Sequence, residues 1–210
     1  MKLSECKKCI LCETRKQVVK GNGNKKSKIL LIGEAPGRNE DNVGIPFVGS
    51  AGKVLNKVLK KNGIERKEIY ITNVVKCKPP GNRDPFDYEK EKCKIWLEKE
   101  IKKIKPRIIV TLGKHAFNSM KIFYKDALTL LEFNDEIDFV YGIIKEDATK
   151  KLLVRVLHPA ATLYNSNLLS DFEMQIGFLQ QIEDYFVYKN KRFILKKIVI
   201  SRINRHKNGY

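Results

Sequence analysis

The chain has 210 residues, which suits one domain with a sizeable hydrophobic core, and no apolar run in it is long enough to span a membrane. Lysine and arginine total 42 against 24 acidic residues, and the resulting formal net charge of +18 favours a polyanionic partner, most simply nucleic acid. Residues 1–16 contain no apolar signal core, so we expect a cytoplasmic, intracellular protein without membrane association.

The cysteines are Cys6, Cys9 and Cys12 near the start of the chain, followed by Cys77 and Cys93. In an intracellular protein they are better interpreted as metal ligands than as disulfides. Four thiolates can hold a zinc ion or a [4Fe-4S] cluster, and the C-x-x-C pair can be Cys6 with Cys9 or Cys9 with Cys12. Taken alone, the pattern favours zinc, because structural zinc is the commoner case.

The stretch from Gly33 to Gly52 is the longest loop that the pattern predicts. It follows an apolar strand at residues 28–32 and precedes a helix that begins near Val54 and ends at Asn62. Loops of this length are usually functional. The mixture of glycines, carboxylates and Phe47 suits a pocket where backbone approaches a ligand, although neither the Walker nor the dinucleotide-binding glycine spacing is present.

Strands and helices alternate along the rest of the chain. Further strands are predicted at residues 69–75, 107–112 and 152–157, and further helices at residues 84–105, 114–123 and 168–186, the first of them capped and started by Asp84-Pro85. For residues 124–150 we expect a hairpin or a partly ordered insertion. The alternation predicts an α/β fold, a three-layer α/β/α arrangement around a central, mainly parallel four-stranded sheet.

The end of the chain, residues 189–210, is rich in lysine and arginine and has no acidic residue. We expect residues 1–188 to form the folded domain, with the metal-ligand segment at its start, and residues 189–210 to form a basic extension. The extension is either a solubilising appendage or an arm that binds DNA.

Four short motifs fall at or near the carboxyl ends of the predicted strands. Their leading residues are Gly33-Glu34, Asn73, Gly113 and His158. In parallel α/β sheets, ligands bind at this edge. The strand pattern therefore predicts one crevice to which all four motifs contribute.

These motifs carry a resemblance to a known family. They read Gly33-Glu34-Ala35-Pro36-Gly37 with Glu40-Asp41 and Pro46-Phe47-Val48-Gly49, then TNVVKCKPPGNR at residues 72–83, then Thr111-Leu112-Gly113, then His158-Pro159-Ala160-Ala161. In this order they resemble the family 4 uracil-DNA glycosylases, the iron–sulfur members of the uracil glycosylase superfamily. The resemblance implies a monomeric DNA repair enzyme that flips uracil out of uracil-containing DNA and hydrolyses its N-glycosidic bond, leaving an abasic site.

The resemblance also reverses the choice of metal. The family places two ligands before the first strand, one after the asparagine motif and one in the next helix, and Cys6, Cys9, Cys77 and Cys93 match these positions. They would hold a [4Fe-4S] cluster with a structural role, and Cys12 would be a free thiol.

The family's substrate-binding roles fall on three side chains. Phe47 would stack on the flipped base. The Asn73 amide can donate to uracil O4 and accept from N3–H, whereas cytosine presents the reverse polarity. His158, as a neutral imidazole near uracil O2, would stabilise the negative charge that develops on the departing base.

The group that positions the attacking water is harder to assign, because Ala35 stands where family 1 relatives have an aspartate. Glu40 is the first choice for this catalytic role and Glu34 the second. The backbone amides from Gly33 to Ala35 would also face the substrate, and Leu163 is the candidate to fill the space that the flipped base leaves.

Two other functions remain open. A non-catalytic zinc or Fe–S module that binds nucleic acid would explain the charge and the cysteines, but not Asn73 or His158. A glycosylase for another deaminated base would share the same motifs.

Overall fold

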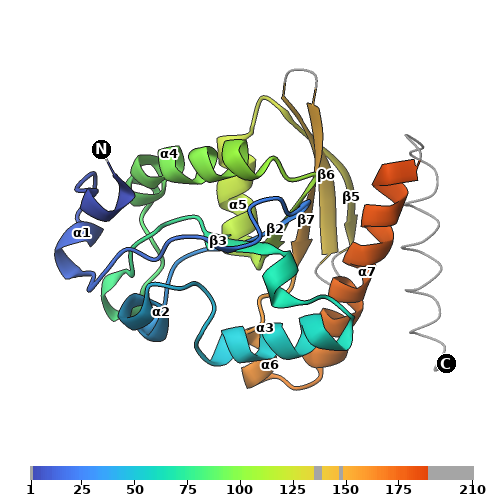
Figure 1. Cartoon of the computed structure of the whole chain (residues 1–210), viewed down its shortest axis with the longest axis horizontal. Coiled ribbons are helices and arrows are strands. Elements are labelled where there is room, and N and C mark those ends of the chain that lie inside the picture. The colour runs from blue at the N-terminus through green and yellow to red at the C-terminus, as the bar shows by residue number, and fades with distance from the viewer. Residues whose placement is uncertain (1, 135–138, 147–148, 189–210) are drawn as a thin grey trace. The chain divides into compact units, whose positions relative to one another are not determined.

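The structure is a computed structural model, and it describes residues 2–134, 139–146 and 149–188 (Figure 1). The chain divides into two compact units, Met1–Gly177 and Phe178–Tyr210, and every site residue discussed below belongs to the first unit. The predicted basic extension at residues 189–210 lies outside the described residues. Among the described helices, none is both long and apolar enough to cross a membrane.

Seven strands form one sheet in the order β1-β3-β2-β4-β7-β6-β5. Their bounds are β1 Asn22–Gly23, β2 Ile29–Gly33, β3 Tyr70–Asn73, β4 Ile108–Leu112, β5 Leu128–Asn134, β6 Phe139–Glu146 and β7 Thr149–Val156. The central strands β3, β2, β4 and β7 run parallel, which confirms the predicted parallel sheet. β1 and the β5–β6 hairpin add antiparallel strands at the two edges, so the sheet has seven strands where four were expected.

Helices lie on both sides of the sheet. Their bounds are α1 Leu11–Thr14, α2 Arg38–Val43, α3 Ser50–Lys61, α4 Asp87–Ile104, α5 Lys114–Phe123, α6 Ala161–Tyr164 and α7 Leu168–Tyr188, with short 3-10 turns at Leu3–Glu5, Arg66–Glu68 and Pro80–Asn82. The buried side chains of α4 and α5, such as Trp96 and Phe117, share one core with Leu30 and Ile32 of β2. Figure 1 shows α3 on the other side of the strands from α4, as the three-layer prediction requires.

The prediction of one unbroken loop between Gly33 and Gly52 is wrong, because α2 lies within it. Gly37 caps this helix and donates its N–H to the carboxylate of Glu40 at 3.1 Å, while Gly44 ends it in the left-handed conformation, φ +78°. Glycine adopts that conformation without strain. The same glycines that suggested a loop therefore mark the two ends of a helix.

The predicted helix start at Asp84-Pro85 is also wrong. Phe86 is the N-cap, and its backbone N–H donates to the carboxylate of Glu89 at 2.8 Å, so α4 begins at Asp87. An acidic residue at the third helical position satisfies a backbone donor that otherwise lacks a partner.

Candidate active site

A cavity of about 650 Å³ opens at the carboxyl ends of the parallel strands. It is lined by residues 34–37, 79, 82–84, 112–115, 157–158, 160–161 and 164. These positions come from the segments that follow β2, β3, β4 and β7, which are the four motifs of the sequence. The sheet edge thus brings together stretches that are far apart in the chain.

The side chains of Phe47 and Asn73 both pack against Gly33, which directly precedes Glu34 of the cavity lining. A side-chain carbon built on Gly33 would collide with the Asn73 amide oxygen and would lie 2.6 Å from the Phe47 ring, so only glycine allows this approach. Phe47 itself has φ +53°, a conformation that costs a residue with a side chain roughly 1 kcal/mol or more. Backbone strain of this kind is concentrated at functional sites.

Asn73 carries a buried acceptor that has no partner. The residue is 2% exposed, and its Oδ1 atom makes no hydrogen bond with the rest of the described chain. Leaving a buried amide oxygen unpaired costs about 1–3 kcal/mol, so such atoms call for an explanation. A ligand that donates a hydrogen bond at this point is the simplest one.

His158 has the electronic state that the predicted role requires. Burial, reinforced by the nearby His115, lowers the pKa of His158 to about 4, so the imidazole is neutral at pH 7. Its Nδ1 atom accepts a hydrogen bond from the Ala160 N–H at 3.2 Å, which leaves the proton on Nε2 as a donor. The His158 ring lies 6.0 Å from the Phe47 ring, centroid to centroid.

The buried neutral state of His158 makes stability depend on pH. The unfolded chain takes up this proton near pH 6.5 and the folded chain only near pH 4, so unfolding is favoured as the pH falls through that window. We expect this one group to lower the free energy of unfolding by about 2 kcal/mol between pH 7 and pH 5. Urea unfolding of the wild type and of His158→Gln at both pH values measures the difference. Equal losses in the two proteins would contradict it.

Glu40, the first choice for positioning water, has another role in the structure. Its Oε1 atom accepts the N–H groups of Val48 and Gly49 at 2.9 and 2.8 Å, and its Oε2 atom accepts that of Gly37. Glu40 is absent from the cavity lining, as are Phe47 and Asn73, so its hydrogen bonds decide its role. With both oxygens bound to backbone, its carboxylate holds the two ends of the loop together.

Glu34, the second choice, lies in the cavity wall. Its Oε1 atom is buried without a hydrogen bond in the described chain, and the Nζ of Lys90 lies 3.9 Å from it. Burial raises the pKa of Glu34, while the charges of His115 and Lys90 lower it and that of Asp84 raises it. The geometry therefore favours Glu34 over Glu40 as the carboxylate that acts on water.

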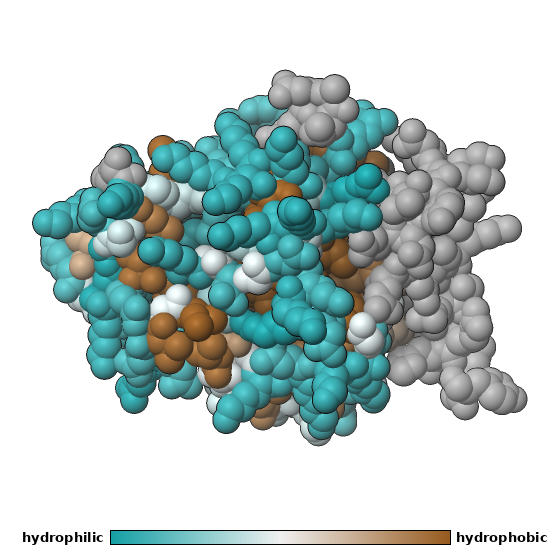
Figure 2. Space-filling model, viewed as in Figure 1, coloured by the Kyte–Doolittle hydropathy of each residue, from teal (hydrophilic) through white to brown (hydrophobic). Residues whose placement is uncertain are grey.

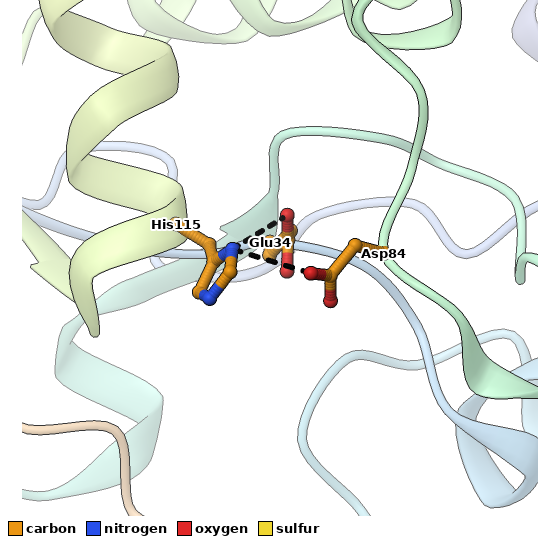
Figure 3. Close-up of side chains that lie close together, drawn as sticks. All are labelled: Glu34, Asp84 and His115. Carbon is orange, nitrogen blue, oxygen red and sulfur yellow. Dashed lines mark ion pairs between the residues drawn. The ribbon is translucent and has the colours of Figure 1, made fainter.

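His115 is a functional candidate that the motif pattern missed. Its Nδ1 atom lies 3.7 Å from the Glu34 carboxylate and 3.5 Å from that of Asp84, and Figure 3 shows the three side chains converging. The sequence feature that could have identified His115 is its position two residues after Gly113, at the carboxyl end of a predicted parallel strand. Only the fold reveals that this histidine adjoins Glu34.

The cysteines line a second, much smaller cavity beside α4. All five of them border it, and three accept hydrogen bonds from N–H donors: Cys6 from Trp96 at 3.2 Å, Cys77 from Arg15 at 3.1 Å and Cys93 from the backbone of Lys76 at 3.3 Å. Burial raises the pKa of the Cys93 thiol to about 12, so that thiol ionises only beside a strong positive charge such as a metal. Sulfurs that accept N–H donors are the environment of metal-bound thiolates.

A profile of the uracil DNA glycosylase superfamily matches residues 20–182, and the chain belongs to this superfamily. Within it, the chain is similar to proteins named type-4 uracil-DNA glycosylase. It is 43% identical to that of Archaeoglobus fulgidus over 81% of this chain and 84% of the relative. It is 45% identical to that of Sulfurisphaera tokodaii over 84% of this chain and 80% of the relative. It is 36% identical to that of Thermotoga maritima over 86% of this chain and 92% of the relative.

Proposed function

We propose that this protein is a DNA repair glycosylase that removes uracil from DNA and leaves an abasic site. The observation that carries the proposal is the unpaired, buried amide oxygen of Asn73, placed beside Phe47 in a member of this superfamily. An amide is the side chain that can match the edge of uracil, with one acceptor for N3–H and donors for O4.

The reaction follows from the groups in and next to the cavity. The base leaves the stack, stacks on Phe47 and presents its N3–H and O4 edge to the Asn73 amide. Glu34 accepts a proton from a water molecule, whose oxygen bonds to deoxyribose C1′ as the bond from C1′ to uracil N1 breaks. The electron pair of that bond goes to the base, and the Nε2–H of His158 stabilises the resulting charge at O2. Solvent then protonates the uracil anion.

One rival function fits the site less well. A module that only binds nucleic acid has no use for the strained Phe47 or the unpaired Asn73 oxygen. Thymine and hypoxanthine present the same pair of N–H donor and carbonyl acceptor to the Asn73 amide as uracil does, so the excision assay compares these bases with uracil.

An oligonucleotide assay tests the proposal directly. Protein purified without oxygen is incubated with DNA that contains one uracil, and alkali then cleaves the strand at abasic sites. We expect cleavage at the uracil position and none in the matched thymine strand. Intact uracil-containing DNA after incubation would refute the proposed function.

We also infer that Cys6, Cys9, Cys77 and Cys93 hold a [4Fe-4S] cluster. All five cysteines border one small cavity, and three of their sulfurs accept N–H donors. Four thiolates in this setting can hold such a cluster. The cluster would tie the N-terminal segment to the loop after β3.

Iron content distinguishes the ligand cysteines from Cys12. Cys77→Ser should lose the iron, because it removes a buried ligand whose sulfur also accepts a hydrogen bond from Arg15. Cys12→Ser should retain about four iron atoms per chain, because Cys12 is not one of the four ligands. Iron and sulfide analysis of anaerobically purified protein measures both. Loss of iron in Cys12→Ser with retention in Cys6→Ser would show instead that Cys9 and Cys12 form the pair.

Further expectations accompany this function. The partner is uracil-containing DNA, which the net charge of +18 favours. A genomic DNA substrate implies an intracellular location. The monomeric state and the role of residues 189–210 in binding DNA stay predictions.

A further inference from the structure

A partly buried ion pair fixes the segment between the cavity and α4. The Nη1 and Nη2 atoms of Arg83 donate to the two carboxylate oxygens of Glu89 at 2.9 and 2.7 Å, and Glu89 is fully buried. The backbone N–H of Phe86 donates to the same carboxylate at 2.8 Å. Because bidentate pairs of this kind impose one geometry, residues 83–89 form a rigid support.

Two aromatic side chains stand on this support and remain half exposed. Phe86 is 54% and Tyr88 49% exposed, and their rings stack with centroids 6.1 Å apart at an angle of 23°. The guanidinium carbon of Arg83 lies 3.8 Å from the centre of the Phe86 ring. The fold gains little from rings left in water, whereas pre-ordered aromatic rings bind planar groups well.

The aromatic pair adjoins the cavity along the chain. Asn82, Arg83 and Asp84 line the cavity wall, and Phe86 follows two residues later. A DNA strand whose uracil enters the cavity would therefore pass the rings with its neighbouring nucleotides.

The charges around the rings favour bases over phosphates at this point. Asp84 precedes the two aromatic residues in the sequence and Asp87 lies between them, with side chains that are 68% and 90% exposed. Asp84 lies 3.5 Å from His115 and Asp87 lies 3.3 Å from Lys90, so neither carboxylate attracts phosphate groups, and the strand would turn its bases toward the rings. Attraction for the phosphates comes from the rest of the chain, whose net charge is +18. Figure 2 shows hydrophilic residues over most of one face of the molecule.

We propose that Phe86 and Tyr88, held in place by Arg83 and Glu89, form a stacking surface for unpaired bases next to the flipped uracil. The proposal rests on the proposed function and narrows its substrate to single-stranded or locally opened DNA. Bases in an intact duplex are already stacked and paired. Bases of a single strand are free to stack on aromatic side chains, whatever the DNA sequence.

Binding of uracil-free DNA tests the surface. Dissociation constants of the wild type and of the double variant Phe86→Ala with Tyr88→Ala are measured on one single strand and on its duplex, at the same salt concentration. We expect binding of the single strand to weaken by roughly tenfold or more and binding of the duplex by less than about twofold. A 2-aminopurine base in the single strand should be quenched by the wild type and much less by the variant.

Two control variants separate stacking from other effects. Phe86→Leu with Tyr88→Leu keeps apolar bulk without rings and should lose single-strand affinity as the alanine variant does. Ile95→Ala removes a 40% exposed apolar side chain elsewhere on α4 and should change neither affinity. Thermal unfolding of every variant checks that the fold is intact.

Several results would overturn the stacking surface. These are equal losses on single strand and duplex, no loss on either, and wild-type affinity in the leucine variant. Because the DNA contains no uracil, a failure of the proposed function would appear separately, as absence of excision by the wild type.

Discussion

Lys76→Met should lower the free energy of unfolding by about 3–5 kcal/mol. Lys76 is fully buried, and its Nζ atom donates to the Thr72 hydroxyl at 2.7 Å, the Asn73 carbonyl at 2.7 Å and the Glu100 carboxylate at 2.6 Å. Methionine fills most of the same volume, so little of the loss comes from packing. The cost arises because Glu100 keeps a charge in a site with little water after its partner has gone.

Urea unfolding of the anaerobically purified full chain measures this effect. Lys61→Met is the matched control, because the Lys61–Glu173 pair has the same 2.6 Å separation but a lysine side chain that is 62% exposed. Exposed pairs contribute less than about 1 kcal/mol, so the control should lose little stability. Adding Glu100→Gln to Lys76→Met should recover part of the loss. Similar losses for Lys76→Met and Lys61→Met would contradict the argument.

Lys76 also joins the two sites of the molecule. Its backbone N–H donates to the sulfur of Cys93, and its side chain holds the carbonyl of Asn73. The cysteine cavity and the residue that would read the base are therefore connected through one buried residue. The metal proposed for the cysteines would influence the order of the active site through this connection.

The parallel strands could be predicted from the sequence because their signal is local. β2 is a continuous apolar run, and all five of its residues are buried. The β5–β6 hairpin gives a weaker signal, since its apolar residues are interrupted by charged ones and its strands are defined by pairing with β7. Pairing between strands depends on tertiary contacts that a pattern along the chain does not contain.

The candidate site was predictable in part for the same reason. The positions of Asn73 and His158 follow from the ends of strands, and the structure places both at that edge of the sheet. The choice between Glu34 and Glu40 depends on hydrogen bonds that form only in the folded chain, where the backbone occupies both oxygens of Glu40. The sequence placed the start of α4 too early because Asp84-Pro85 is a good local signal for the start of a helix. In the folded chain the Glu89 carboxylate accepts the backbone N–H of Phe86, which makes Phe86 the N-cap.

Asn73→Asp should reduce single-turnover excision of uracil by roughly 30-fold to 1000-fold, equivalent to about 2–4 kcal/mol in the transition state. The aspartate keeps the size of the side chain but replaces the two amide donors with a second acceptor. It therefore loses the hydrogen bond to uracil O4 and places a negative charge beside a base that becomes an anion. Because the Asn73 oxygen is buried and unpaired, water does not compensate for the change.

Measurements at saturating enzyme separate this chemical effect from weaker DNA binding. Asn165→Asp is the matched control: it adds the same charge just after Tyr164 in the cavity wall, and an aspartate oxygen can still accept the Asn167 N–H, which lies 3.1 Å from Asn165 Oδ1. This control should excise uracil at nearly the wild-type rate. Asn73→Asp should also excise cytosine better relative to uracil than the wild type does, since the carboxylate can accept from the cytosine amino group. Equal excision of uracil by Asn73→Asp and the wild type would remove Asn73 from base recognition, and an equal loss in Asn165→Asp would assign the effect to charge alone.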